Sequence, residues 1–491
     1  MSEREEEFEE VNRFYASEET FFPGDWLTYA ETLEAQEEFG IDIDDGSSLE
    51  EYVPLRSAEQ ATAGLDSNWA GLEWLDREVC ELLEVKAEEA AVGRDVQGIP
   101  WYQLPYSRED FRRFRLQQNL SEKLTRNEVF DDRSKATCDF CNPSTSCFFR
   151  FFHFTRRVRC SVSHYQLRHL VWAPHPHLVY TQHERTVARW DVLRRQRKSV
   201  LHYSQLQGTF IESGAMSMCV GQNILVLGGR CGELALFDLA NRKILTEFYS
   251  SEDDSAIVNA LTIVEDSNSM SGKLYCCSND CFVRFYNLSR LELERRIQFP
   301  FAVNHASLHP DGSLLVVGGD DTRVLLYDLR ADCVAQTLYG HSDYTFSTSW
   351  HPDGIFVATG NQDLTCRIWD SRMSEKGPVH TLPARMDAVR SVQFSPNGRY
   401  FAMAEHTDFV HIYDLSKRVF EERQEVDIFG DISGMTFTKV SAYRLKDNLT
   451  DSWQDCESMF IGIRDNEYGG IMELEREKYD ILNVLNKQIG R

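Results

Sequence analysis

Long apolar runs are missing from this 491-residue sequence. No stretch reaches the roughly 18 apolar residues that a membrane-spanning helix needs, and the segment Met1 to Glu5 lacks the basic and apolar parts of a secretory signal. We therefore expect a cytoplasmic or nuclear protein with no membrane contact. The 13 cysteines are an odd number, and several lie in strand-like apolar runs, which favours buried reduced thiols over a disulfide framework.

Motifs of catalysis are also absent. The sequence has no Gly-x-Ser-x-Gly elbow for a nucleophile and no glycine loop of the kind that cradles phosphate, so we expect no enzyme and no cofactor. Cys138, Cys141 and Cys147, with His153 or Cys160 downstream, have the ingredients of a zinc knuckle. Because the second half of this spacing is irregular, a loop with free thiols is favoured over bound zinc.

Positive charge is scarce. The chain has 52 Lys and Arg against 78 Asp and Glu, a formal net charge of −26, and residues 1–50 alone hold 17 acidic residues against two arginines. A body this acidic repels phosphate backbones and anionic lipid, so direct nucleic-acid binding is not expected. The segment Arg194 to Lys198 is a local basic exception, and a solvated loop is its favoured interpretation.

Residues 1–130 form an acidic extension with helix-like patterns. One apolar stripe at three- and four-residue spacing consists of Trp69, Leu72, Leu75, Val79, Leu82 and Leu83. We expect it to pack on the rest of the chain, with a separate partner as the alternative. After the breakers Gly98 and Pro100, a basic amphipathic helix is predicted around Phe111, Phe114 and Leu116.

From about residue 147 the pattern changes to short β-like runs that repeat. Each unit ends in an aromatic residue followed by Asp or Asn: Trp190-Asp191, Phe237-Asp238, Tyr286-Asn287, Tyr327-Asp328, Trp369-Asp370 and Tyr413-Asp414. The successive spacings are 47, 49, 41, 42 and 44 residues. A period in the forties with this ending is typical of β-propeller blades, each a four-stranded sheet.

A seventh blade is inferred from closure. After the sixth ending, the strand-like runs "ISGMTF", "SMFIGI" and "GGIMELE" remain, with an insertion around residues 439–457 and no outer strand after them. The aromatic run Cys147 to Phe154 can supply that strand by pairing with "GGIMELE", which would remove the exposed sheet edges. The sequence thus predicts an all-β, seven-bladed propeller over residues 131–475 and a helical tail over residues 476–491.

The best-formed unit runs from Gly340 to Asp370 and resembles the WD-repeat family: it has Gly-His before the inner strand, "HPDG" as a hairpin turn and Trp-Asp at the end of the third strand. The resemblance implies a buried, structural hydrogen-bond chain through His341, Thr359, Asp363 and Trp369. Longer segments, such as "GRDVQGIPW" and "AMAEHTDFVHIYD", are similar to uncharacterised plant and fungal WD-repeat (transducin-like) proteins.

The tight-turn carboxylate of the family is kept in only some units. Asp280 and Asp321 match it in the third and fourth blades. Glu184, Cys231 and Thr407 stand in its place in the first, second and sixth blades. We expect those three blades to rely on packing alone.

Two unit endings carry an arginine two residues after the aromatic-Asp pair. They resemble the box by which substrate receptors dock on the propeller adaptor of cullin-RING ubiquitin ligases. The docking set that this resemblance implies is Asp321, Tyr327, Asp328, Arg330, Asp363, Trp369, Asp370 and Arg372. In it, Arg330 and Arg372 would make charge-assisted bonds to the adaptor. Pairing of each arginine with a neighbouring Asp is the plainer alternative.

Loops that open the inner strands converge on the central channel, the usual peptide-binding surface of this fold. Blade position selects Asn304, Tyr344, Arg385, Asp387 and Asp431 as candidate binding residues. We expect a non-catalytic scaffold or adaptor that binds other proteins or peptides, with the cullin-RING receptor as the alternative.

Overall fold

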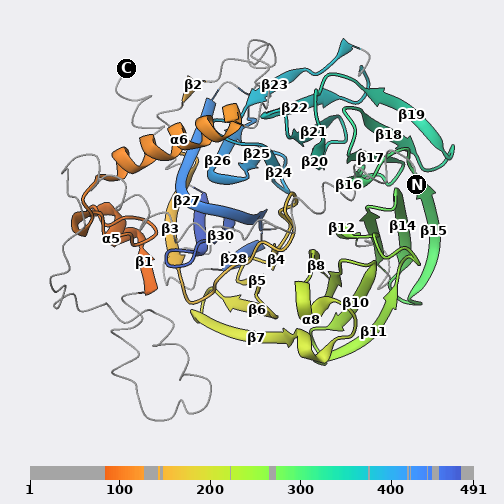
Figure 1. The fold of residues 1–491 in the computed structure, drawn as a ribbon, viewed down its shortest axis with the longest axis horizontal. Coiled ribbons are helices and arrows are strands. Elements are labelled where there is room, and N and C mark those ends of the chain that lie inside the picture. Colours follow the sequence, from red (N-terminus) through yellow and green to blue (C-terminus); the bar gives the residue numbers. More distant parts are fainter. Residues whose placement is uncertain are drawn as a thin grey trace, which may run out of the picture.

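The computed structural model describes residues 83–125, 142–143, 147–221, 223–264, 272–373, 376–416, 420, 422–438, 441–444 and 453–476. These residues form a ring of antiparallel sheets around a central channel (Figure 1). The predicted helical stripe before Leu83, the thiols of Cys138 and Cys141, and the tail after Arg476 lie outside the described residues. Within the described part, no helix is both long and apolar enough to cross a bilayer.

Five blades are separate four-stranded meanders. Blade one holds β4 (Val171–His175), β5 (Leu178–His183), β6 (Thr186–Asp191) and β7 (Gln196–His202). Blade two holds β8 (Ser217–Gly221), β9 (Ile224–Gly228), β10 (Glu233–Asp238) and β11 (Lys243–Tyr249). Blade three holds β12 (Val258–Val264), β13 (Lys273–Ser278), β14 (Phe282–Asn287) and β15 (Glu292–Gln298). Blade four holds β16 (Val303–Leu308), β17 (Leu314–Gly319), β18 (Val324–Asp328) and β19 (Cys333–Leu338). Blade five holds β20 (Thr345–Trp350), β21 (Phe356–Asn361), β22 (Thr365–Asp370) and β23 (His380–Pro383).

Blades six and seven share one nine-stranded sheet. Its strands are β24 (Val389–Phe394), β25 (Tyr400–Glu405), β26 (Thr407–Asp414), β27 (Glu422–Phe437), β30 (Ser458–Arg464), β31 (Gly470–Arg476), β3 (Phe149–Thr155), β1 (Glu84–Lys86) and β2 (Asn142–Pro143). The long β27 serves both blades, because its first half pairs with β26 and its second half with β30. At the bend Gly430 has a φ of +123°, and a Cβ there would lie 2.7 Å from the carbonyl oxygen of Arg464. The seven-bladed prediction is therefore confirmed.

The ring closes through β3, which lies in the aromatic segment that the sequence predicts for this role. β3 pairs with β31, with Phe149 opposite Arg476 and Phe154 opposite Met472. The inner strand of blade seven, in β27, contacts β4 of blade one, which completes the circle. β1 then adds to β3 with Glu84 opposite Thr155. This strand lies ahead of residue 131, where the sequence predicts the propeller to begin; three residues are too few to show a strand pattern, and only pairing reveals them.

Helices are few in the described part. They are α5 (Ala87–Ala91), α6 (Arg108–Thr125), α8 (Phe210–Ser213) and the short turns η1 (Trp101–Gln103) and η2 (Tyr203–Gln205). α6 is the predicted basic amphipathic helix, and its Phe111 is only 6% exposed. A small hairpin, β28 (Ser441–Arg444) with β29 (Trp453–Cys456), occupies the predicted insertion.

The core lies between neighbouring blades, where each sheet packs on the next. Trp190 and Trp369, the aromatic residues of two predicted unit endings, are both fully buried in such clusters. Several cysteines are buried there as free thiols, and burial raises the pKa of the Cys276 thiol to about 12. Among the described cysteines, free thiols thus stand in place of a disulfide framework; several are buried, whereas Cys147 and Cys333 are exposed.

Candidate interaction surfaces

The polar chain predicted in blade five joins the loop before β20, which carries His341, to the turn between β21 and β22, which carries Asp363. The Nδ1–H of His341 donates to Asp363 over 2.8 Å, and its Nε2 lies 2.8 Å from the hydroxyl of Thr359. The indole N–H of Trp369 donates to the same hydroxyl over 2.9 Å. Burial lowers the pKa of His341, which keeps the ring neutral. Because all four side chains are buried, they stabilise the blade and offer nothing to a partner.

Turn carboxylates also stabilise blades two and six, so the expectation that these blades rely on packing alone is wrong. In blade two Glu233 accepts backbone N–H bonds from Thr209 (2.9 Å) and Cys231 (2.7 Å). In blade six Asp408 accepts the N–H of Gly430 over 2.9 Å. Both acids lie one or two residues beyond the aligned position. Their reach across the turn depends on three-dimensional geometry that spacing does not contain.

The segment from Asp95 to Asn119, here called the strap, crosses the edge where blades six and seven meet (Figure 1). Its aromatic residues pack on Phe429 of β27, with ring centroids 5.3 Å away for Trp101 and 5.2 Å away for Phe111. The side-chain amide of Gln97 makes the two hydrogen bonds that a neighbouring strand would make to Phe429. It donates to the carbonyl oxygen of Phe429 over 2.8 Å and accepts the N–H of Phe429 over 2.7 Å. The strap is thus built into the propeller.

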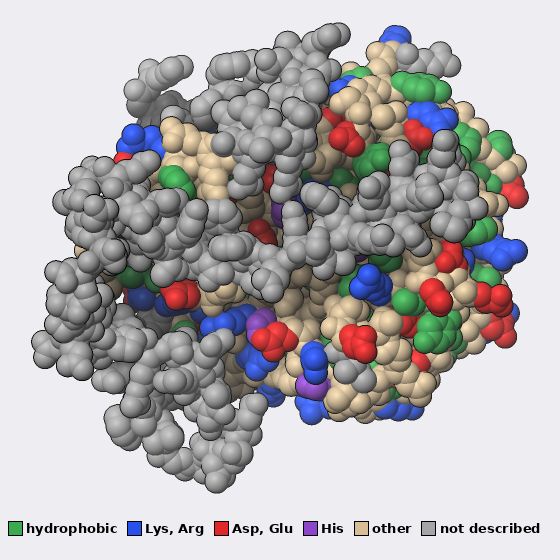
Figure 2. All heavy atoms as spheres, viewed as in Figure 1, with side chains coloured by type: hydrophobic (Ala, Val, Ile, Leu, Met, Phe, Trp, Pro, Cys, Tyr) green, Lys and Arg blue, Asp and Glu red, His purple; other side chains and the backbone are tan. Residues whose placement is uncertain are grey.

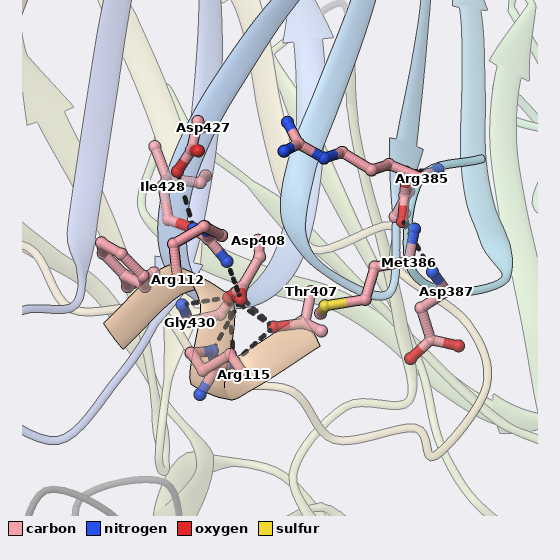
Figure 3. Close-up of polar contacts among 12 residues, drawn as sticks. Arg112, Arg115, Arg385, Met386, Asp387, Thr407, Asp408, Asp427, Ile428 and Gly430 are labelled. Atoms are coloured by element: carbon pink, nitrogen blue, oxygen red, sulfur yellow. Dashed lines mark hydrogen bonds and ion pairs between the residues drawn. The ribbon is translucent and has the colours of Figure 1, made fainter. Parts of the chain in front are cut away.

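Arginines of α6 fix the strap through two aspartates (Figure 3). Arg112 and Arg115 both bind Asp408, whose side chain is 0% exposed, over 2.6 and 2.7 Å. Arg112 also binds Asp427 over 2.7 Å, and Arg108 reaches the same carboxylate over 2.9 Å. Burial opposes ionisation of Asp408, but the two guanidinium groups still hold its pKa below the usual value. This site was not predicted from the sequence, although the arginines share a helical face with Phe111.

The central channel is filled at one end by residues 161–169, here called the plug. Leu167 of the plug is 2% exposed and packs with Phe346 and Ala388 on the inner side of blades five and six. The ring of His169 lies 4.8 Å from that of His305 in blade four. Burial lowers the pKa of His169 to about 4, so the ring stays neutral. The linker between β3 and β4 therefore narrows the central channel at this end.

The candidate channel residues of blades four and five differ in access. Asn304 is 2% exposed and donates to Asp320 over 2.8 Å and to the carbonyl oxygen of Thr345 over 3.2 Å, which gives it a structural role. Tyr344 is 42% exposed and available to a partner. Burial raises the pKa of both Asp320 and Asp343 in the neighbouring turns.

The other three candidates are engaged with residues of blades six and seven. The guanidinium of Arg385 binds Glu425 and lies 4.7 Å above the ring of Phe409. Asp387 lies 3.4 Å from His406, and Asp431 lies 3.4 Å from Arg464. Arg385 and Asp387 share a loop whose backbone N–H groups donate to Glu405 (Figure 3).

Comparison with known proteins identifies the repeats. The model of the "WD domain, G-beta repeat" family matches residues 296–328, 332–370 and 376–414, which span blades four to six. Blades four to six therefore contain WD repeats. Blade five resembles the family most fully, because it has the complete hydrogen-bond chain.

Individual relatives are distant. "U3 small nucleolar RNA-associated protein 21" of Saccharomyces cerevisiae is 23% identical over 46% of this chain and 22% of its own length. An uncharacterized protein of Schizosaccharomyces pombe is 22% identical over 56% of this chain and 80% of its own length. "Pre-mRNA-processing factor 19" of Oryza sativa is 31% identical over 22% of this chain and 21% of its own length. The chain thus matches about a fifth of the length of two of these three relatives.

The two arginines of the predicted docking box differ in their contacts. Arg372 donates from Nε and Nη2 to Asp370, over 3.0 and 2.7 Å, which is the plainer alternative. Arg330 lies in an exposed turn, and its backbone N–H donates to the carboxylate of Asp328 over 2.7 Å. Asp321 precedes β18, binds Arg323 over 2.6 Å, and lies at the opposite end of that strand from Arg330. The docking role stays a prediction.

A wide cavity opens at the other end of the channel from the plug. It has a volume of about 1040 Å³ and is lined by the ends of inner strands, with Trp172, Tyr275, His309, Pro396 and Phe437 among its walls.

The zinc hypothesis gains no support in the described residues, where no group of His, Cys, Asp and Glu has a metal-binding arrangement. Cys147 there donates its thiol hydrogen to the carbonyl oxygen of Phe149 over 3.0 Å.

Proposed function

We propose that this WD-repeat protein is a non-catalytic scaffold that binds protein segments at the plugged end of its channel. The observation that carries the proposal is a pair of exposed tyrosines there. Tyr165 of the plug is 64% exposed, and Tyr344, two residues before Phe346, is 42% exposed. Exposed tyrosine on a rigid frame is typical of binding hot spots, because it offers a large contact area at a small entropic cost.

Charge at the same end favours a basic partner segment. Asp320 and Asp343 are partly buried carboxylates, and the charge of Asp343 adds to the burial that raises the pKa of Asp320. A lysine or arginine of a partner would relieve this repulsion. Two relatives are named for small nucleolar RNA and for pre-mRNA processing, which supports a place in a nuclear RNA-processing assembly.

Affinity purification of the tagged full-length protein tests the proposal. We expect partners retained by the wild type to be lost from the Tyr165→Ala and Tyr344→Ala variants. Tyr249→Ala is the matched control, since Tyr249 is 62% exposed on the outer strand β11 and far from the channel in sequence and topology. Retention of the same partners by all variants would refute binding at the plugged end.

The second candidate is a substrate receptor of a cullin-RING ligase. Its support is the exposed turn that carries Arg330 after Tyr327-Asp328. The same purification, with Arg330→Ala and Arg372→Ala variants, should recover a ligase adaptor with the wild type only. Absence of an adaptor from the wild-type sample rejects this candidate.

A further inference from the structure

Blade one carries a basic surface that contrasts with the charge of the whole chain. Residues 156–202 contain ten Arg and Lys against only Glu184 and Asp191, in a protein of net charge −26. The basic surface is defined here by Arg156, Arg157, Arg159, Arg185, Arg189, Arg194, Arg195, Arg197 and Lys198. Figure 2 shows several basic side chains over this part of the ring, below the centre of the view, with acidic side chains among them.

These side chains are spread over both ends of blade one. Arg194 and Arg195 lie in the turn between β6 and β7, where Arg194 pairs with Asp191 over 2.9 Å, and Arg185 lies in the turn at the other end of β6. Arg189 of β6 lies opposite Lys198 of β7, and Trp190 lies opposite Arg197. Arg185 and Lys198 are among the exposed residues of the blade. The outer strand β7 and the turns beside it thus present several like charges to solvent within one sheet.

Cations of the basic surface contribute to the pKa shifts of nearby groups. Burial lowers the pKa of Arg156; Tyr468 opposes this, and the charges of Arg94 and Arg159 lower it further. Burial also lowers the pKa of His183 against the opposing charge of Glu184, and Arg159 and Arg197 add to the lowering. A surface on which cations repel one another is stabilised by any anion that settles on it.

One carboxylate of the N-terminal region is already seated against the basic surface. Glu84, at the start of β1, lies 3.4 Å from the Nε of Arg157 and 3.3 Å from the Nη1 of Arg195. Burial opposes its ionisation, yet His153 and these arginines hold its pKa below the usual value. The start of β1 therefore places the carboxylate of Glu84 against basic side chains next to blade one.

The residues immediately before this acid are strongly anionic. Residues 1–82 contain 24 Asp and Glu against four Arg and join the described chain one residue before Glu84. An 82-residue segment can span well over 200 Å when extended, at about 3.3–3.6 Å per residue. Its length therefore does not restrict where it reaches, and its attachment point lies beside the only strongly basic stretch of blade one.

We propose that the basic surface of blade one is the docking site of the acidic segment 1–82 of the same chain. Tethering beside the surface raises the effective concentration of the acidic side chains that lie nearest the attachment point. Attraction between exposed charges is screened by salt, so docking is strong at low ionic strength and weak at high ionic strength. Docking also shields the basic surface from other polyanions.

Zero-length carbodiimide cross-linking of the full-length protein tests the docking, because it joins an amine to a carboxylate only when the two are in contact. Lys198 is the one lysine of the basic surface. We expect cross-links from Lys198 to carboxylates in residues 1–82, several-fold fewer near 0.5 M salt than near 0.05 M salt. Lys243 is the matched control, because it is also exposed and lies on the corresponding outer strand of blade two. It should give few cross-links to residues 1–82.

Two variants sharpen the cross-linking result. Lys198→Arg keeps the charge but removes the amine, so its cross-links should vanish while the basic surface stays intact. Arg185→Glu with Arg197→Glu reverses two exposed charges and should lower the yield at Lys198 several-fold. Absent cross-links, or yields that are equal at Lys198 and Lys243, would overturn the proposal.

Two further outcomes point to a different occupant and also overturn it. Cross-links between isotopically light and heavy copies in a mixed sample would assign the surface to a second copy's acidic segment. Tight binding of an oligouridylate by the full-length wild type, lost in the Arg185→Glu, Arg197→Glu variant, would show that the surface is open to a phosphate backbone.

Discussion

At the residue scale, Glu473 is an acid held inside a sheet. It lies on β31 opposite His153, with only 4% exposure, and burial together with the charge of Glu475 raises its pKa to about 8. The folded state thus binds a proton that the unfolded chain releases near its ordinary pKa of 4.5. By linkage, this contribution to stability is full below pH 4.5 and is lost as the pH rises through about 8.

Glu473→Gln should remove this pH dependence. We expect the free energy of unfolding of the wild type to fall, relative to the variant, by roughly 1–3 kcal/mol between about pH 6 and pH 9. Denaturant unfolding at the two pH values measures the difference. Glu475→Gln removes the neighbouring negative charge but leaves Glu473 in place, so it should move the wild-type pH dependence to lower pH without abolishing it. Parallel profiles for Glu473→Gln and the wild type would contradict the argument.

At the element scale, the strap depends on the buried carboxylate of Asp408. Asp408→Asn keeps the shape and suits the φ of +69° at this position, since Asn tolerates the left-handed region. It leaves Arg112 and Arg115 without their shared anion, and removing one partner of a buried pair costs about 3–5 kcal/mol. We expect α6 to detach before the propeller unfolds, because the blades do not need it to close.

Hydrogen exchange distinguishes detachment of the strap from global unfolding. Amides of residues 108–119 should lose protection in Asp408→Asn while those of blade four keep theirs. Asp427→Asn is the milder control. The Asp427 side chain is 26% exposed, so water can solvate the arginines that lose its negative charge. Unchanged protection of α6 in Asp408→Asn would show that the aromatic packing on Phe429 suffices by itself.

At the scale of the whole molecule, ring closure joins the two ends of the propeller. Phe154 of β3 is 0% exposed and packs in the core of blades six and seven. Phe154→Ala should lower the free energy of unfolding by about 3–5 kcal/mol. Because a closed ring has no free edge from which to open blade by blade, we expect a single unfolding transition with a lower midpoint. A separate early transition confined to blade seven would contradict this.

Local patterns in the sequence determined most of the architecture. The period in the forties, the aromatic-Asp endings and the apolar run near Phe149 were sufficient for seven blades and their closure, because a strand's pairing follows from its alternation and from the need to cover every edge. The chain His341, Thr359, Asp363 and Trp369 was also readable, since all four lie within one unit.

Only the tertiary structure decided how segments from different units meet. Asp408 and Arg112 are 296 residues apart, and nothing local marks them as partners. The plug, the three-residue β1 and the shifted turn acid Glu233 likewise depend on where loops go once the ring is closed. Sequence periodicity reports neighbours along a strand or helix. Contacts across the ring are set by packing and electrostatics, which the fold must first bring into range.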